Sequence, residues 1–310
     1  MDIDLVYLWV DGNDPQWLEK RRPYFKIVDE KSDVTCKGRY MNNDELKYSL
    51  RSAEKYAPWI RQIFIVTDNQ KPNWLDTTNP KIKIIDIKDI MPQDCLPCFN
   101  SIVIECYFYK IPGLSEQFLY ANDDMFFNAD VQPDFFFAKD GFPIVRLKRR
   151  YWEKLKFRVR LFMGEKPGTH RTEVYNASVL VEKKFGKYYS GMPHHNIDAY
   201  KKNDFRNAIE DIFREQAIKS KTNRVRTKND LGRSVISYYA LAIGHGHLKY
   251  VEIEESAFLH VFKPDIMERL RFLKPKLFCL NDNEHVTDED RERIRPFLET
   301  IFPEKSQFEL

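Results

Sequence analysis

The residues with the clearest chemical potential form a short acidic turn within "FLYANDDMFF" (118–127). Asp123 and Asp124 are adjacent carboxylates, so they repel each other, and next to a buried strand each also loses hydration. Mg²⁺ is a natural partner, because it binds one or two carboxylates together with substrate phosphates. A solvated turn is the alternative, but apolar residues resume at once at Met125.

Basic residues and imidazoles occur in the second half of the chain. "RLKRRYWEKLKFRVR" (146–160) holds eight basic residues and one acidic residue, with aromatic side chains between them. Such a segment suits an anionic acceptor or a phospholipid surface, and a solvated face is the alternative. Arg224 and Arg226 are expected in a loop suited to phosphate binding. The pair His194-His195 is a candidate for proton transfer.

These side chains need elements to position them, and the apolar pattern predicts an α/β arrangement. Short stretches rich in β-branched and aromatic residues predict four strands, at 5–10, 62–68, 81–87 and 117–123. Three apolar stripes predict helices: Leu46, Leu50 and Ala53, ended by Pro58; Ile102, Cys106 and Tyr109, ended by Pro112-Gly113; and Phe205, Ile209, Ile212, Phe213 and Ile218. Strand–helix–strand alternation predicts a mostly parallel sheet.

Ligands of parallel α/β sheets bind at the carboxyl ends of the strands. Three acidic turns follow predicted strands there: residues 11–14, Asp68-Asn69 and Asp123-Asp124. We therefore expect them on one rim of the sheet.

Composition limits the class of protein. A net charge of +3 over 310 residues is too small for a nucleic-acid-binding protein. The five cysteines are few and odd in number, so a disulfide framework is not expected, and Cys95-Leu-Pro-Cys98 is a lone CxxC motif. The sequence shows neither a basic leader nor an apolar run of membrane-spanning length, so we expect a cytoplasmic protein, with contact to a membrane surface as an option.

Eight longer strings in four blocks extend over nearly the whole chain. They are "IDLVYLWVDGNDPQW" (3–17); "NNDELKYSLRSAEKYAPWIRQIFIVTDNQKPNWL" (42–75), "LPCFNSIVIE" (96–105) and "IPGLSEQFLYANDDMFF" (111–127); "GMPHHNIDAYKK" (191–202) and "NRVRTKND" (223–230); "FCLNDN" (278–283) and "FPEKSQFEL" (302–310). Together they resemble the Stealth family, which includes bacterial capsular polysaccharide phosphotransferases and lysosomal-enzyme N-acetylglucosamine-1-phosphotransferase. Leu8 and Cys98 stand where the family more often has Thr, and Cys98 thereby weakens the case for CxxC chemistry.

The resemblance implies transfer of a hexose- or N-acetylhexosamine-1-phosphate from a UDP-sugar to a hydroxyl of a glycan acceptor, in capsular or cell-surface polysaccharide synthesis. UMP leaves and a phosphodiester forms. One alternative is a metal-dependent glycosyltransferase, which would release UDP instead. A more distant one is a non-catalytic module that binds glycans or membrane surfaces through 146–160.

The resemblance also implies roles for individual residues. Glu105, Asp124 and Arg226 match functional residues of the family, and Asp123 and Asp124 are expected to hold Mg²⁺ (or Mn²⁺). The catalytic His has two candidates, His194 and His195, because Gly191 stands where the family commonly has His; His194 is favoured. Residues expected to line the donor site are Trp9, Asp11, Gly12, Asn122, Asn281 and Asp282.

The expected fold is an α/β, Rossmann-like or GT-A-like one, with a mostly parallel sheet flanked by helices and a more helical C-terminal half that completes the active site. Residues 1–310 are expected to form a single Stealth-type catalytic unit without accessory domains. Its 1–145 part would bind the nucleotide-sugar, and its 146–310 part would bind the acceptor.

Overall fold

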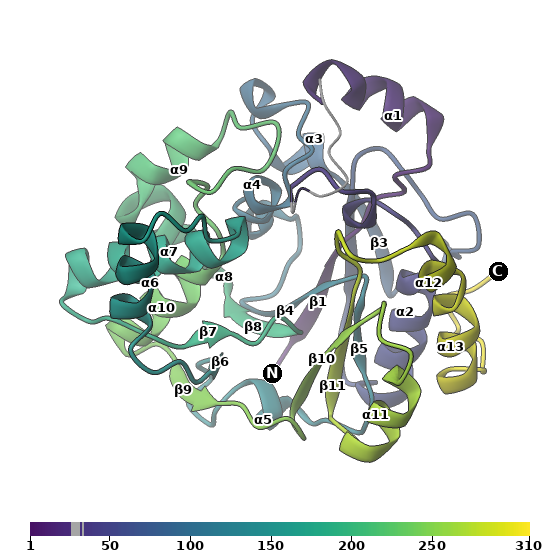
Figure 1. Ribbon diagram of the computed structural model, residues 1–310. Coiled ribbons are helices and arrows are strands. Elements are labelled where there is room, and N and C mark those ends of the chain that lie inside the picture. Colours follow the sequence, from purple (N-terminus) through teal and green to yellow (C-terminus); the bar gives the residue numbers. More distant parts are fainter. Residues whose placement is uncertain (26–31, 33) are drawn as a thin grey trace.

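A five-stranded sheet runs through the middle of the protein (Figure 1), which is described here from a computed structural model covering residues 1–25, 32 and 34–310. Its strands, in spatial order, are β3 (Ile82–Asp86), β2 (Ile63–Thr67), β1 (Ile3–Leu8), β4 (Gln117–Asn122) and β8 (Asp198–Lys201). The first four are parallel, and β8 pairs antiparallel with β4 at the edge. The four predicted strands and the α/β class are therefore confirmed.

Two smaller sheets flank the central one, and neither was predicted. One contains β10 (Ser256–His260), β11 (Leu277–Asn281) and β5 (Met125–Phe127). The other contains β7 (Met192–Pro193), β6 (Ile144–Lys148) and β9 (His247–Tyr250). Their strands have two to five residues, and most of their partners are distant in sequence, so local periodicity gives little signal for them.

Helices complete the fold. Their bounds are α1 (Pro15–Arg21), α2 (Glu45–Tyr56), α3 (Ile87–Ile90), α4 (Ser101–Glu105), α5 (Pro133–Phe136), α6 (Glu153–Phe162), α7 (Thr169–Phe185), α8 (Lys202–Asn207), α9 (Arg214–Ser220), α10 (Ser234–Ile243), α11 (Ile266–Leu273), α12 (Asp288–Glu292) and α13 (Ile294–Ile301). No helix of the described residues is both long and apolar enough to cross a membrane.

The two faces of the central sheet have separate cores. Leu46, Leu50 and Ala53 of α2 pack with the β1 side chains Leu5 and Tyr7 on one face, as predicted, and α2 ends two residues before Pro58. Val6 points the other way, into a core formed with residues of α4, α7, α8 and α10. Both faces of β1 are thus buried, as in other parallel sheets.

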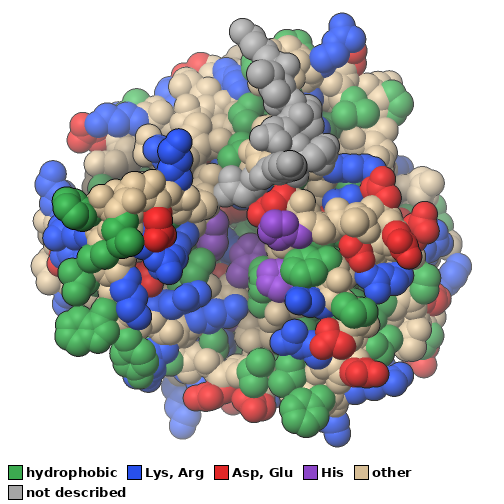
Figure 2. Space-filling model, in the orientation of Figure 1, with side chains coloured by type: hydrophobic (Ala, Val, Ile, Leu, Met, Phe, Trp, Pro, Cys, Tyr) green, Lys and Arg blue, Asp and Glu red, His purple; other side chains and the backbone are tan. Residues whose placement is uncertain are grey.

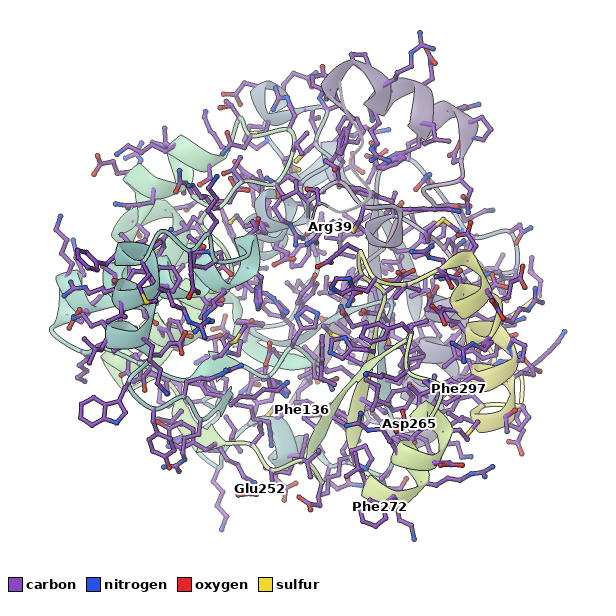
Figure 3. The ribbon with its side chains drawn as sticks, viewed as in Figure 1. Arg39, Phe136, Glu252, Asp265, Phe272 and Phe297 are labelled. Carbon is purple, nitrogen blue, oxygen red and sulfur yellow. The ribbon has the colours of Figure 1, made fainter. Side chains whose placement is uncertain are left out.

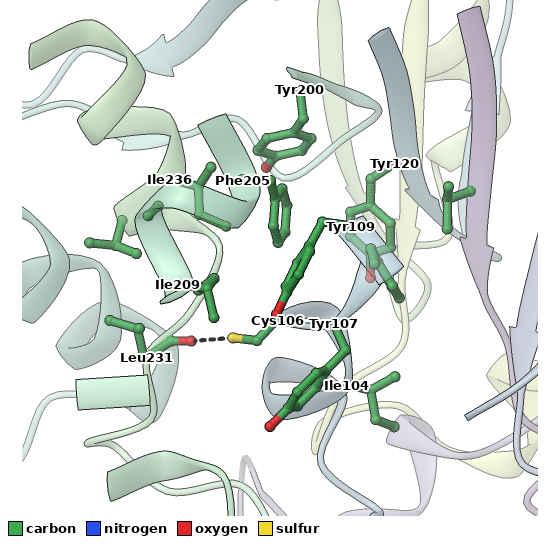
Figure 4. Packing of buried hydrophobic residues seen from close by; sticks show 14 of the residues in the cluster. Ile104, Cys106, Tyr107, Tyr109, Tyr120, Tyr200, Phe205, Ile209, Leu231 and Ile236 are labelled. Atoms are coloured by element: carbon green, nitrogen blue, oxygen red, sulfur yellow. Dashed lines mark hydrogen bonds between the residues drawn. The ribbon is translucent and has the colours of Figure 1, made fainter. Parts of the chain in front are cut away.

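The second core joins the two halves of the chain (Figure 4). There the Cys106 thiol donates a hydrogen bond to the Leu231 carbonyl at 3.2 Å, beside Ile209 and Ile236 from the C-terminal half. The predicted continuous helix over this region is wrong. The chain forms only α4 and then a 3-10 turn (Phe108–Lys110).

The predicted helix that begins near Phe205 is also interrupted. A π-helical turn (Ala208–Ile212) separates α8 from α9. Phe205, Ile209 and Phe213 are buried as expected, but Ile218 is 50% exposed, so it does not belong to the core stripe.

Candidate active site

A cavity of about 650 Å³ opens at the carboxyl ends of β1, β2, β4 and β11. Figure 2 shows a hollow with histidine side chains near the middle of this face. The predicted site residues that line the cavity are Trp9, Asn122, Asp123, Asp124, His195, Arg226, Asn281 and Asp282. They come from both halves of the chain, so the cavity is the candidate active site.

The acidic turn of this site connects two sheets. Strand β4 ends at Asn122 in the central sheet, whereas β5 begins at Met125 and pairs antiparallel with β11. The backbone N–H of Leu280 donates to the Asp124 carbonyl at 2.9 Å, which fixes the turn against β11. The apolar residues on either side of Asp123-Asp124 thus belong to different sheets, and the carboxylates lie where the sheets meet.

The carboxylates of the turn are poorly compensated. Asp124 Oδ2 accepts a weak bond from the Cys279 thiol at 3.4 Å, while Asp124 Oδ1 is buried and has no hydrogen-bond partner among the described residues. Burial raises the pKa of Asp124, and it raises that of Asp123 further, together with the negative charge of Glu45. Glu45 also lines the cavity. This arrangement favours a cation.

Three side chains offer ligand atoms at this point. Oxygen, nitrogen and sulfur atoms of Asp124, His195 and Cys279 lie within 4.8 Å of one another and could hold a metal ion. Burial raises the pKa of the Cys279 thiol well above its usual value, so the sulfur stays protonated. Hard cations prefer oxygen ligands. The unpartnered oxygen of Asp124 and the nearby Asp123 therefore fit Mg²⁺ or Mn²⁺ better than the thiol does.

His195 reaches the cavity from the loop between β7 and β8. Its backbone is left-handed (φ 53°), an uncommon conformation for a residue with a side chain. The flanking side chains of His194 and Asn196 both bond Ser256 Oγ of β10, at 2.9 and 3.1 Å, and so anchor the loop. Burial, with His170 and Arg233 adding positive charge, lowers the pKa of His195 well below its usual value, so the ring is neutral.

His194, the favoured catalytic candidate, does not line the cavity. It is 1% exposed, and its Nε2 lies 2.8 Å from Asp198 Oδ1. Both ring nitrogens are thus occupied by protein groups, which leaves no free nitrogen for a substrate. The sequence could not separate two adjacent histidines, whereas burial does.

Glu105 also lies behind the cavity wall and is connected to His194. Its Oε1 accepts from the Tyr120 hydroxyl at 3.1 Å, and its Oε2 lies 3.5 Å from Arg233 Nε. Arg233 Nη1 donates to Asp198 Oδ2 at 3.2 Å, and Asp198 holds His194. Arg233 was missed in the sequence, since nothing in its local pattern marks it. The network ties Glu105 to the loop that carries His195.

Arg226 lies in the predicted loop, which a buried aspartate organises. Asp230, 3% exposed, accepts from the Thr227 backbone at 2.7 Å, from Asn223 at 2.7 Å and from Asn100 at 2.8 Å. Asn100 precedes α4, whose Ser101 hydroxyl accepts a bond from the Arg226 guanidinium. The loop is therefore fixed against the first half of the chain, with Arg226 in the cavity wall.

Other predicted donor-site residues lie away from the cavity or are engaged by protein groups. Asp11 and Gly12 do not line it: the Asp11 backbone pairs with the Gln70 amide, and the Gly12 N–H donates to Tyr40 at 2.8 Å. Asp282 does line it, but Arg291 binds both of its carboxylate oxygens, at 2.7 and 2.9 Å.

Lys148 and Arg150, from the basic segment 146–160, also line the cavity. Polar residues of the cavity wall that were not singled out in the sequence are Glu45, Thr67, His170 and His260. Thr67 Oγ1 and Trp9 Nε1 are buried without a hydrogen-bond partner among the described residues. Unpartnered polar atoms that line a cavity are suited to a polar ligand.

Three conserved regions of Stealth proteins match the chain: region 1 at residues 1–26, region 2 at 39–145 and region 4 at 268–310. The chain belongs to the Stealth family. The acidic turn lies in the second region, and Asn281 and Asp282 lie in the fourth.

Alignments with named relatives extend over 99% of this chain. An exopolysaccharide phosphotransferase, cps2G, of Lactiplantibacillus plantarum is 32% identical over 99% of this chain and 96% of its own length. The capsular polysaccharide phosphotransferase SacB of Neisseria meningitidis serogroup A is 33% identical over 99% of this chain, which spans 57% of SacB. WcwK of Streptococcus pneumoniae, also a capsular polysaccharide phosphotransferase, is 28% identical over 99% of both.

A solved structure, that of the galactosyltransferase LgtC with donor and acceptor sugar analogs, aligns over 98% of this chain with a TM-score of 0.45 and 11% identity.

Proposed function

We propose that this protein is a sugar-1-phosphate transferase, which moves a hexose- or N-acetylhexosamine-1-phosphate from a UDP-sugar to a hydroxyl of a glycan acceptor in capsular or cell-surface polysaccharide synthesis. The observation that carries the proposal is the convergence of Asp123-Asp124, His195 and Arg226 on one cavity from distant parts of the chain. The phosphotransferase names of the relatives support the same class of reaction.

The chemistry needs a base, charge stabilisation at phosphorus and a nucleotide site. The acceptor oxygen attacks the phosphorus attached to the sugar, the bond to the bridging oxygen breaks, and UMP leaves. His195, neutral and in the cavity wall, takes the proton of the attacking hydroxyl. Arg226 lies against the phosphoryl oxygens, where it stabilises negative charge.

Asp123 and Asp124 would hold Mg²⁺ (or Mn²⁺), which supplies positive charge to the diphosphate when bound. Glu105 acts as a positioning residue, since it reaches the His195 loop through Arg233 and Asp198 rather than touching the cavity. The uridine would lie near Trp9 and Thr67, whose polar atoms lack protein partners.

The two halves of the chain divide these tasks within a single catalytic unit. The 1–145 part supplies the nucleotide-sugar side through β1, β2 and β4, and the 146–310 part supplies His195 and Arg226 together with the acceptor side.

A labelled donor distinguishes this reaction from glycosyl transfer. A UDP-sugar carrying ³²P in the phosphate next to the sugar is incubated with the protein, Mg²⁺ and a panel of glycan acceptors. We expect the label in the acceptor, UMP as the second product, and a phosphodiester signal by ³¹P NMR. Label retained in UDP would establish a glycosyltransferase instead, and the absence of turnover with every hexose and N-acetylhexosamine donor would contradict the proposal.

A further inference from the structure

Helix α6 carries an apolar stripe on its outer side. Leu155, Val159 and Phe162 are spaced four and three residues apart, which places them on one face of the helix, and Trp152 precedes the helix as its N-cap residue with a left-handed backbone (φ 59°). The exposed fractions of Trp152, Leu155, Val159 and Phe162 are 74%, 58%, 46% and 93%. Exposed large hydrophobic residues are common singly, but here three lie on one helical face and a fourth lies at its N-terminus.

The opposite side of α6 is firmly attached to the protein. Phe157 is 2% exposed and stacks on Tyr175 of α7 with ring centroids 3.9 Å apart. At the start of the helix, Glu153 accepts from Arg171 at 2.9 Å. The core-facing side of the helix is therefore satisfied, and the outward direction of the stripe is fixed by packing.

Cations flank the stripe. Lys156 and Arg160 lie on one side of it and Arg158 on the other, because helical residues are about 100° apart around the axis. All three are exposed. In Figure 2 hydrophobic and basic side chains lie together on the left of the face, over α6 in the matching view of Figure 1. An apolar face bordered by Lys and Arg is typical of helices that lie in a membrane interface.

We propose that α6 docks onto an anionic phospholipid bilayer, with its apolar stripe in the acyl boundary and its cations at the headgroups. A second copy of the chain fits less well, because it would bring two strongly basic segments together: residues 146–160 hold eight basic residues and one acidic residue. An anionic polysaccharide would pair with the cations but would leave the indole of Trp152 and the ring of Phe162 in water.

The docking helix lies close to the cavity along the chain. Strand β6 ends at Lys148, which lines the cavity together with Arg150, and Trp152 follows two residues later. A docked α6 would hold the cavity near the membrane surface, where a lipid-linked glycan acceptor could reach it. This consequence for the acceptor rests on the proposed function, whereas the docking itself does not.

Vesicle sedimentation tests the docking without any turnover. The purified chain is mixed with two kinds of vesicle. One contains phosphatidylcholine alone, and the other also contains about 30 mol% of the anionic lipid phosphatidylglycerol. We expect binding to the anionic vesicles only, and loss on raising the salt. Lys156→Glu with Arg158→Glu should weaken binding by about 30-fold or more, at about a tenfold change for each 1.4 kcal/mol. Trp152→Ser with Phe162→Ser should weaken it at least about 10-fold.

Matched controls come from α11, which also exposes an aromatic residue next to cations. Phe272 is 87% exposed and points outward at the lower edge of Figure 3. Phe272→Ser, and Arg271→Glu with Lys274→Glu, should leave vesicle binding within about twofold of the unaltered chain. Equal loss in these controls would mean nonspecific attraction and would overturn the proposal.

The proposal would also be overturned if the unaltered chain did not bind anionic vesicles. Binding of the chain to an anionic polysaccharide but not to the vesicles would assign the basic segment to that polysaccharide instead. Transfer to a soluble acceptor separates this proposal from the proposed function. Trp152→Ser with Phe162→Ser should retain that turnover, since neither residue lines the cavity. If turnover is absent in all chains but vesicle binding follows the pattern above, only the proposed function fails.

Discussion

The buried network behind the cavity makes a quantitative prediction for Arg233→Met. The side chain of Arg233 is 14% exposed, and it lies between Glu105 and Asp198, which are 9% and 12% exposed. Methionine is similar in length but leaves the Glu105 carboxylate without its cation. Removal of one partner from a buried ion pair costs about 3–5 kcal/mol, and the partial exposure favours the lower end, about 3 kcal/mol.

The loss should depend on pH in a defined direction. Burial raises the pKa of Glu105 above 4.5, and Arg233 opposes this rise. Without Arg233 the folded pKa of Glu105 rises further. A carboxyl whose folded pKa exceeds its unfolded pKa loses stability as the pH rises between the two values. The destabilisation should therefore be larger at pH 7 than at pH 5.

Urea denaturation followed by circular dichroism at both pH values measures this effect. The control is the double variant Glu105→Gln with Arg233→Met, which removes the uncompensated charge and should recover about 1–2 kcal/mol of the loss. A single variant within about 0.5 kcal/mol of the unaltered protein, or a double variant no more stable than the single one, would refute the reasoning.

Three further predictions concern the cavity. Asp124→Asn should weaken Mg²⁺ binding, measured by calorimetry, by more than about 10-fold, and unchanged affinity would exclude it as a ligand. His195→Ala should lower kcat by about 10²–10⁴-fold, and near-normal turnover would exclude it as the base. Asp230→Asn alone should lower kcat/KM, but it should cause no further loss when Arg226→Met is already present. Losses that add up in the double variant would contradict positioning of Arg226 by Asp230.

The first four strands of the central sheet could be predicted from the sequence because each is a local apolar run with a clear end. The same holds for α2, whose apolar spacing and following proline mark both its face and its end. The pairing of Met125–Phe127 with Leu277–Asn281 was not accessible. It joins segments about 150 residues apart, and no local pattern specifies which distant strand a three-residue segment will meet.

Part of the candidate site could likewise be predicted from the sequence, and part could not. The acidic turn was accessible because adjacent carboxylates between apolar runs are chemically costly. The choice between His194 and His195 depends on which ring is enclosed, and that depends on Ser256 and Asp198. Arg233 lies just before α10 with nothing around it in the sequence to mark it. Its role follows only from the charges that the folded chain brings to it.

The acidic turn that connects β4 to β5, and so joins two sheets, limits where this protein can change in length. The alignment with the Lactiplantibacillus plantarum relative extends over 335 positions, whereas the chain has 310 residues, so the two differ by insertions. An added residue between Asn122 and Met125 would shift β4 or β5 by one place, and a one-residue slip turns every side chain of a strand to the opposite face. Connections that leave both registers intact, such as 163–168, can absorb insertions instead. Relatives should therefore vary in size around a junction whose own length stays constant.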